Sequence, residues 1–218
     1  MSCWRGTLPQ GRALFSSIGG ILLARSVVQT TPAVTQFYLI RHGETLWNRQ
    51  RRLQGSQNSP LTEAGLAQAE ALSRELATLE FDAIYASPLE RARITAEIIN
   101  QPHGLPLQLD DGLKERAFGV LEGCHREEQA ELWQALSLRF SQNRVDVPGF
   151  EPADQLQSRA LDALQRIHLA HPQGRVAIVS HGEWLRSVGN AQAGHPAWSD
   201  KTELQGNASF ITLTWPIG

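Results

Sequence analysis

Two strand-like segments of this 218-residue chain lead into the same short motif. The apolar run Phe37–Ile40 is followed by Arg41 and His42, and the run Val176–Val179 is followed by a serine and His181, with a glycine after each histidine. Continuous apolar runs are typical of strands buried on both faces of a parallel sheet. Ligands gather at the carboxyl ends of such strands, so both histidines are expected at one ligand-binding edge.

Helices and strands are expected to alternate along the chain. The expected strands are 37–40, 82–87, 107–109, 175–180 and 209–215, the last at an edge of the sheet. The expected helices run from a cap at Thr62 to 76, over 89–100, over 126–142, through the apolar stripe 156–167, and from about 182. This alternation predicts an α/β three-layer sandwich, in which helices flank a mostly parallel central sheet.

The first 35 residues differ from the rest, because no Asp or Glu precedes Glu44 while Arg5, Arg12 and Arg25 are present. We interpret 1–35 as a leader outside the fold. An apolar stretch at 13–24 also fits a secretory signal or an organellar transit peptide. The remainder, 36–218, is expected to form a single catalytic domain. A cytoplasmic location is expected unless 1–35 is a targeting segment.

Charge and apolar patterning exclude several classes of partner. The chain carries 20 Lys+Arg against 22 Asp+Glu, a formal net charge of −2, which gives no reason to expect nucleic acid or an anionic membrane. No apolar run reaches the roughly 18 residues of a membrane-spanning helix. The two cysteines form neither a disulfide framework nor a metal motif, and no metal site is expected.

The residues at the strand ends suit phosphoryl chemistry. The planar fork of Arg41 can donate two hydrogen bonds to a phosphoryl group, while His42 attacks the phosphorus and forms a phosphohistidine. Arg91 and Arg93 follow the second expected strand and can stabilise the same charge. Glu115 is the best candidate for the acid that protonates the leaving oxygen.

Four motifs in order resemble the histidine phosphatase superfamily, also called the phosphoglycerate mutase-like family. They lie at 41–48 with its continuation 54–65, at 87–96, at 115–123 and at 180–182. The resemblance implies a phosphoglycerate mutase-like fold without metal or cofactor. It implies His42 as the phosphorylated nucleophile, Glu115 as proton donor, and three groups that hold the phosphoryl, namely Arg41, Arg91 and His181. It further implies a phosphate contact from Asn48 and a pocket lined by Gln54, Gly55, Arg93 and Gly182.

Three positions depart from the family pattern. Asn58 stands where the family commonly has Asp, a change expected to be structural, and 150–152 replace a Gly-Glu-Ser segment of the pocket rim. Glu183 follows Gly182 where the family more often has an apolar or small residue. Its carboxylate either faces the pocket, repelling anions or binding a cationic part of a substrate, or points outward.

The predicted activity is hydrolysis of a phosphomonoester by a metal-independent enzyme of the histidine acid phosphatase type. The segment from Glu115 to His181 is shorter than in the mutase branch, where an insertion keeps water from the phosphohistidine. Phosphoglycerate mutase-type transfer and a non-catalytic phospho-ligand-binding protein are the alternatives. The expected partner is a small phosphorylated metabolite, and the strand 209–215 leaves a homodimer open. His168 and His171 are interpreted as surface histidines.

Overall fold

The computed structural model describes residues 33–125, 128, 130–137 and 147–216. Most of the expected leader, and parts of the helix expected over 126–142, lie outside these residues. Within them, no helix is both long and apolar enough to cross a membrane.

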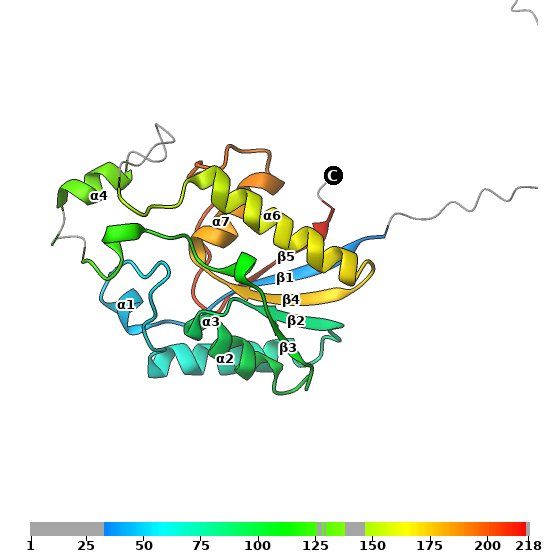
Figure 1. The fold of residues 1–218 in the computed structure, drawn as a ribbon. Coiled ribbons are helices and arrows are strands. Elements are labelled where there is room, and N and C mark those ends of the chain that lie inside the picture. The colour runs from blue at the N-terminus through cyan, green and yellow to red at the C-terminus, as the bar shows by residue number, and fades with distance from the viewer. Residues whose placement is uncertain (1–32, 126–127, 129, 138–146, 217–218) are drawn as a thin grey trace, which may run out of the picture. The chain divides into compact units, whose positions relative to one another are not determined.

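A five-stranded sheet forms the centre of the domain (Figure 1). Its strands are β1 (Thr35–Arg41), β2 (Ala83–Ala86), β3 (Leu107–Leu109), β4 (Arg175–Ser180) and β5 (Phe210–Trp215). Their order is β3-β2-β4-β1-β5, and only β5 runs antiparallel to its neighbour, at the edge. The predicted mostly parallel sheet and its C-terminal edge strand are therefore confirmed.

Helices cover both faces of this sheet. In Figure 1, α2 (Glu63–Leu76) and α3 (Glu90–Asn100) lie below it, and α6 (Ala153–Ala170) and α7 (Gly182–Gln192) lie above it. Two short helices, α1 (Leu46–Arg49) and α4 (Ala130–Ser137), and two 3₁₀ turns at Asp111–Leu113 and Gly119–Leu121 complete the described elements. The predicted three-layer sandwich is confirmed.

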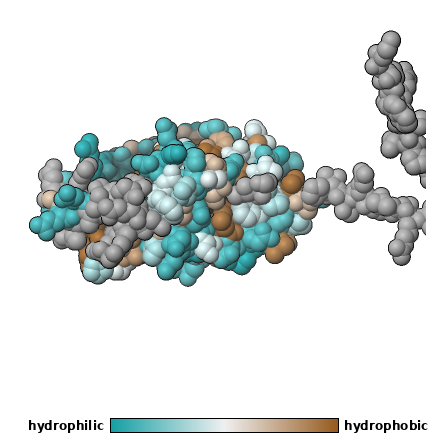
Figure 2. Space-filling view, turned by 90° about the horizontal axis from the view of Figure 1, so that it is seen from above, coloured by the Kyte–Doolittle hydropathy of each residue, from teal (hydrophilic) through white to brown (hydrophobic). Residues whose placement is uncertain are grey.

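Strand β1 shows why two helical layers form, because its side chains are buried on both faces. Phe37 and Leu39 pack into the core beneath α6 and α7, whereas Tyr38 and Ile40 pack into the core against α2 and α3. Among the coloured atoms of Figure 2, hydrophilic residues predominate and apolar residues occur in small groups. The apolar run read from the sequence thus corresponds to a strand between two cores.

The register of the sheet brings the two histidine motifs together. Strands β1 and β4 are neighbours and pair in parallel, with Arg41 opposite Ser180. The residues that follow, His42 and His181, therefore leave the sheet at the same edge. The backbone N–H of His42 donates to the Ser180 carbonyl at 3.1 Å, which continues this pairing beyond the strand.

The interpretation of His168 as a surface histidine is wrong. Its side chain is 9% exposed, and its Nδ1 lies 2.8 Å from the hydroxyl of Thr35, which starts β1. His171 is half-buried, with its Nε2 3.2 Å from the Tyr85 hydroxyl. Both rings fasten the end of α6 to the sheet, at the end of the strands opposite to His42.

Candidate active site

His42 is held as a neutral imidazole with a defined tautomer. Its ring is 2% exposed, and burial, followed by the charges of Arg91 and Arg41, lowers its pKa well below the usual value. Its Nδ1 lies 2.7 Å from the carbonyl oxygen of Gly43, which can only accept a hydrogen bond. Nδ1 therefore carries the hydrogen, and Nε2 keeps the lone pair that a nucleophile needs.

His181 is the second imidazole of the site. Its ring centroid lies 5.2 Å from that of His42, with 58° between the ring planes. The side chain is fully buried, and among the described residues neither ring nitrogen has a hydrogen-bond partner. Burial lowers its pKa well below the usual value, and the charges of Arg91 and the other nearby cations act in the same direction. In a neutral imidazole one of these nitrogens carries a hydrogen, and that N–H is available to donate to a ligand.

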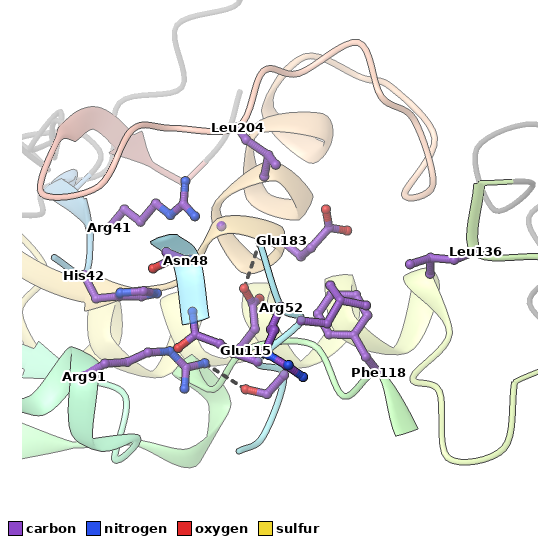
Figure 3. A pocket seen from close by; sticks show the side chains of 14 residues that line it. Arg41, His42, Asn48, Arg52, Arg91, Glu115, Phe118, Leu136, Glu183 and Leu204 are labelled. Carbon is purple, nitrogen blue, oxygen red and sulfur yellow. Dashed lines mark hydrogen bonds between the residues drawn. The ribbon is translucent and has the colours of Figure 1, made fainter. Parts of the chain in front are cut away.

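Arg91 and Arg41 supply fixed positive charge beside His42 (Figure 3). Arg91 is 1% exposed and donates to the carbonyls of Gly55 and Gln57, each at 2.7 Å. Burial lowers its pKa to about 10, so it stays charged at neutral pH. Arg41 donates to the Gln205 carbonyl. Within the described part of the chain, the Nε atoms of both arginines lack acceptors.

Asn48 presents an amide to the same cavity. Its Oδ1 accepts from the backbone N–H and the hydroxyl of Thr45, at 3.1 and 3.0 Å, and from the Nδ2 of Asn207 at 3.4 Å. Because these donors occupy the oxygen, the Nδ2 of Asn48 is the end of the amide left to donate to a ligand. The expectation that Asn48 contacts phosphate fits this orientation.

Glu115 lies at the amino end of α7. Its carboxyl group accepts from the backbone N–H groups of Arg116, Trp184 and Glu183, at 2.9, 3.2 and 3.3 Å. Burial raises its pKa; the Arg116 N–H bond opposes this, and the charge of Glu183 adds to it. Glu115 therefore keeps its proton to a higher pH than an ordinary carboxyl, as a general acid requires.

These groups line one cavity of about 200 Å³. Of the residues predicted from the sequence, the lining includes Arg41, His42, Asn48, Gln54, Gly55, Arg91, Glu115 and Gly182. His181 lies directly behind, against His42. Arg93 differs from the sequence prediction, because it is absent from the lining and pairs with Glu97 on the exposed face of α3.

Five lining residues were not predicted from the sequence: Arg52, Leu53, Phe118, Leu136 and Leu204. Four of them are apolar, whereas Arg41 and Arg91 make the surroundings of His42 cationic. Arg52 donates to the Gly123 carbonyl at 2.7 Å and pairs with Glu128 at 3.1 Å. Its position two residues before Gln54, a motif residue, was the only available signal.

The side chain of Glu183 faces the cavity. It is 8% exposed and forms ion pairs with Arg186 at 2.7 Å and with Arg116 at 3.3 Å. The outward-pointing alternative is therefore wrong. Arg116 is itself buried and lies over the ring of Phe150, 4.3 Å from its centroid.

The other two departures from the family pattern, at Asn58 and at 150–152, contact the residues that support the site. Asn58 Oδ1 accepts from the backbone N–H of Glu90 at 3.1 Å and from Arg91 at 3.4 Å, a structural role as expected. Glu151 pairs with Arg159 at 2.6 Å, and Arg159 donates to the Glu115 carbonyl at 2.9 Å. The segment that replaces the family's rim pattern therefore braces the loop of Glu115.

Comparison with known proteins agrees with this geometry. The sequence profile of the histidine phosphatase superfamily (branch 1) matches residues 37–217. The metal-independent phosphoserine phosphatase of Arabidopsis thaliana is 42% identical over 167 residues, which are 74% of this chain and 70% of that protein. A probable phosphoglycerate mutase, GpmB, of Citrobacter koseri is 40% identical over 186 residues, 83% of this chain and 85% of that protein.

A solved structure shows the same fold. YhfR of Bacillus stearothermophilus superposes with a TM-score of 0.76 at 35% sequence identity, covering 82% of this chain and 90% of that one. The profile match covers every group assembled around His42, and the two sequence relatives carry the names of a phosphatase and a mutase. The chain belongs to branch 1 of the histidine phosphatase superfamily.

Proposed function

We propose that this protein is a metal-independent phosphomonoester hydrolase that works through a covalent phosphohistidine on His42, with Glu115 as the proton donor. The main support is that buried nitrogens near His42 lack hydrogen-bond partners among the described residues. These nitrogens belong to Arg41, Arg91 and His181. Buried donors without partners are costly unless a ligand satisfies them. A phosphoryl group has three acceptor oxygens, one for a donor from each of these three side chains, and its negative charge suits the two guanidinium groups.

The first half-reaction transfers the phosphoryl group to the enzyme. The Nε2 lone pair of His42 attacks phosphorus, and the bond between phosphorus and the ester oxygen breaks. The proton of Glu115 moves to that oxygen, and the alcohol leaves. Arg41, Arg91, His181 and the Asn48 amide hold the three remaining oxygens as charge develops on them.

The second half-reaction regenerates the enzyme. A water molecule attacks the phosphorus of phosphohistidine, and the ionised Glu115 takes one of its protons. The bond between phosphorus and Nε2 then breaks, which releases inorganic phosphate and returns His42 and Glu115 to their starting states. The two steps consume one ester and one water and yield one alcohol and one phosphate.

Phosphate release from p-nitrophenyl phosphate and from a panel of small phosphomonoesters tests this proposal. Assays are run in EDTA, with the wild type beside His42→Ala. Samples with ³²P-labelled substrate are quenched in alkali, which preserves phosphohistidine, and are checked for labelled protein. We expect activity in EDTA, an alkali-stable and acid-labile protein label, and at least about a 10³-fold loss in the variant. Activity that needs a metal, or that survives His42→Ala, contradicts the proposal.

Phosphoglycerate mutase-type transfer is the second candidate, supported by the relative of that name from Citrobacter koseri. A mutase keeps its phosphohistidine from water and returns the phosphoryl group to an isomer of the substrate. Incubation with a phosphoglycerate separates the two functions. Phosphate in solution supports hydrolysis, and an isomerised product without free phosphate supports the mutase.

The substrate we propose is a small phosphorylated metabolite, because the cavity holds about 200 Å³. Phosphoserine belongs in the panel, since the relative from Arabidopsis thaliana bears the name of a phosphoserine phosphatase. The substrate with the highest kcat/KM identifies the preferred leaving group.

A further inference from the structure

The loop that carries His42 is held by two helices. The N–H of Gly43 donates to the hydroxyl of Thr95, on α3, at 3.1 Å. The N–H of the next residue, Glu44, donates to the Oε1 of Gln68, on α2, at 3.0 Å. The two backbone N–H groups after His42 therefore each donate to a side chain, one from α3 and one from α2.

Gln68 controls where the Gly43 carbonyl points. This carbonyl and the N–H of Glu44 belong to one peptide group, which is planar and trans, so they point in opposite directions. Fixing the N–H on Gln68 thus directs the carbonyl oxygen to the other side, where it lies 2.7 Å from the Nδ1 of His42. The ring's hydrogen position depends on that carbonyl.

Thr95 fixes the preceding peptide group. Its side chain is fully buried, and its hydroxyl donates to the Arg91 carbonyl at 2.7 Å. Because the hydroxyl hydrogen is used in this way, the oxygen faces Gly43 as an acceptor only. The loop therefore cannot rotate about Gly43 without leaving the buried Gly43 N–H without an acceptor.

Close packing places Gln68 within reach of the loop. A Cβ on Gly43 would lie 2.5 Å from the Gly65 carbonyl oxygen, and a Cβ on Gly65 would lie 2.0 Å from that of Glu44. Two glycines thus let the first turn of α2 touch the loop backbone. Gln68 stands three residues after Gly65, on the same side of the helix.

We propose that Gln68 and Thr95 are positioning residues that hold the Gly43 carbonyl where it fixes the Nδ1–H tautomer of His42. Neither residue lines the cavity, so their effect reaches the phosphoryl group only through the nucleophile. The consequence for catalysis rests on the proposed function, whereas the tautomer itself does not.

The test uses two matched pairs in the full chain. Thr95→Val removes the hydroxyl at nearly constant shape, and Thr95→Ser keeps it. Gln68→Met removes the acceptor at similar length, and Gln68→Glu keeps an oxygen there. The ¹⁵N spectrum of the histidine rings is recorded for each protein, and the His42 signals are identified as those missing in His42→Asn. The kcat and KM for p-nitrophenyl phosphate are measured in parallel.

We expect the wild type, Thr95→Ser and Gln68→Glu to show protonated Nδ1 and bare Nε2 on His42. In Thr95→Val and Gln68→Met we expect the opposite tautomer to appear and kcat to fall about 10- to 100-fold, with KM changing much less. The wild-type tautomer in both Val and Met variants overturns the proposal, as does a wild-type ring protonated at Nε2.

The matched pair at Gln68 also covers two special cases. If Thr95→Val fails to fold, the pair at Gln68, a half-buried position, decides the question. A wild type that releases no phosphate, but whose tautomer changes in the Met variant, contradicts the proposed function and supports the positioning role.

Discussion

The imidazole rings of His42 and His181 lie 5.2 Å apart, centroid to centroid, with 58° between their planes. Each ring follows one of two neighbouring parallel strands, β1 and β4, and each is buried and neutral. At this distance the two rings pack against each other, and in the proposed reaction the first attacks the phosphoryl group and the second holds it.

Glu115→Gln should affect substrates according to their leaving group. The amide keeps the shape of the side chain and removes the transferable proton. For an alkyl phosphate, whose alkoxide must be protonated as it leaves, we expect kcat to fall about 10²- to 10⁴-fold. For p-nitrophenyl phosphate, whose phenolate leaves without a proton, the first step should fall much less, as measured by the nitrophenol burst. Equal losses on both substrates would rule out Glu115 as the acid.

Glu183→Gln should move the alkaline limb of the kcat/KM profile to lower pH. Burial raises the pKa of Glu115, the Arg116 N–H bond lowers it, the charge of Glu183 raises it further, and the charge of Arg91 lowers it. Glu115 acts in its protonated form, so activity is lost as pH rises through its pKa. Removing the Glu183 charge lowers that pKa, and the loss should begin earlier. Glu97→Gln, on the outer face of α3, serves as control, and a shift toward higher pH would contradict this account.

Arg91→Lys should impair catalysis far more than Arg93→Lys. Lysine keeps the charge but cannot hold the Gly55 and Gln57 carbonyls and direct a third nitrogen to the cavity. We expect kcat/KM for p-nitrophenyl phosphate to fall about 10²-fold, as for loss of one or two charge-assisted hydrogen bonds. Arg93 points away from the cavity, and its lysine variant should stay within about twofold. Similar losses in both variants would contradict the assigned positions.

The free energy of unfolding should fall on acidification below pH 6.5, and less steeply in His181→Gln. The pKa of His181 is lowered in the folded state, so between that pKa and 6.5 the unfolded chain binds more protons. Stability is then lost as pH falls, by up to about 1.4 kcal/mol per pH unit for this group. Urea unfolding between pH 7 and 5 measures the slope. Identical slopes in the wild type and the variant would show that His181 is not buried as a neutral ring.

Local patterns in the sequence were enough to predict the frame of the site. Apolar runs marked β1 and β4, and the expected cap at Thr62 is present, with its hydroxyl accepting from the Gly65 N–H at 3.0 Å. Since parallel strands present their carboxyl ends at one edge, the juxtaposition of His42 and His181 followed from those runs.

Side-chain direction was harder to predict than position. Arg91 and Arg93 are two residues apart on one helix, about 200° around its axis, so only one could face the cavity. Helix geometry therefore excludes one of the two arginines from the cavity, but the sequence did not indicate which one. His168 was misjudged for a related reason, since its partner Thr35 is distant in sequence and nothing local marks the contact.

The apolar residues that line the cavity carried no sequence signal. Leu53, Phe118, Leu136 and Leu204 come from four separate segments that meet only in the folded chain. An isolated leucine in a loop looks the same whether it lines a pocket or faces solvent. Such residues can be assigned to the cavity only once the folded structure is known.

Arg91 also limits how this enzyme could acquire a new substrate. The guanidinium that lines the cavity donates to the carbonyls of Gly55 and Gln57, so the loop at 54–58 is tied to the charge that we propose binds the phosphoryl group. A mutation that reshapes this loop to fit another leaving group would also displace the cation and slow turnover. Leu204 and Leu136 line the same cavity from other segments of the chain. Natural or laboratory selection for altered specificity should therefore accumulate changes at these two leucines and spare the loop.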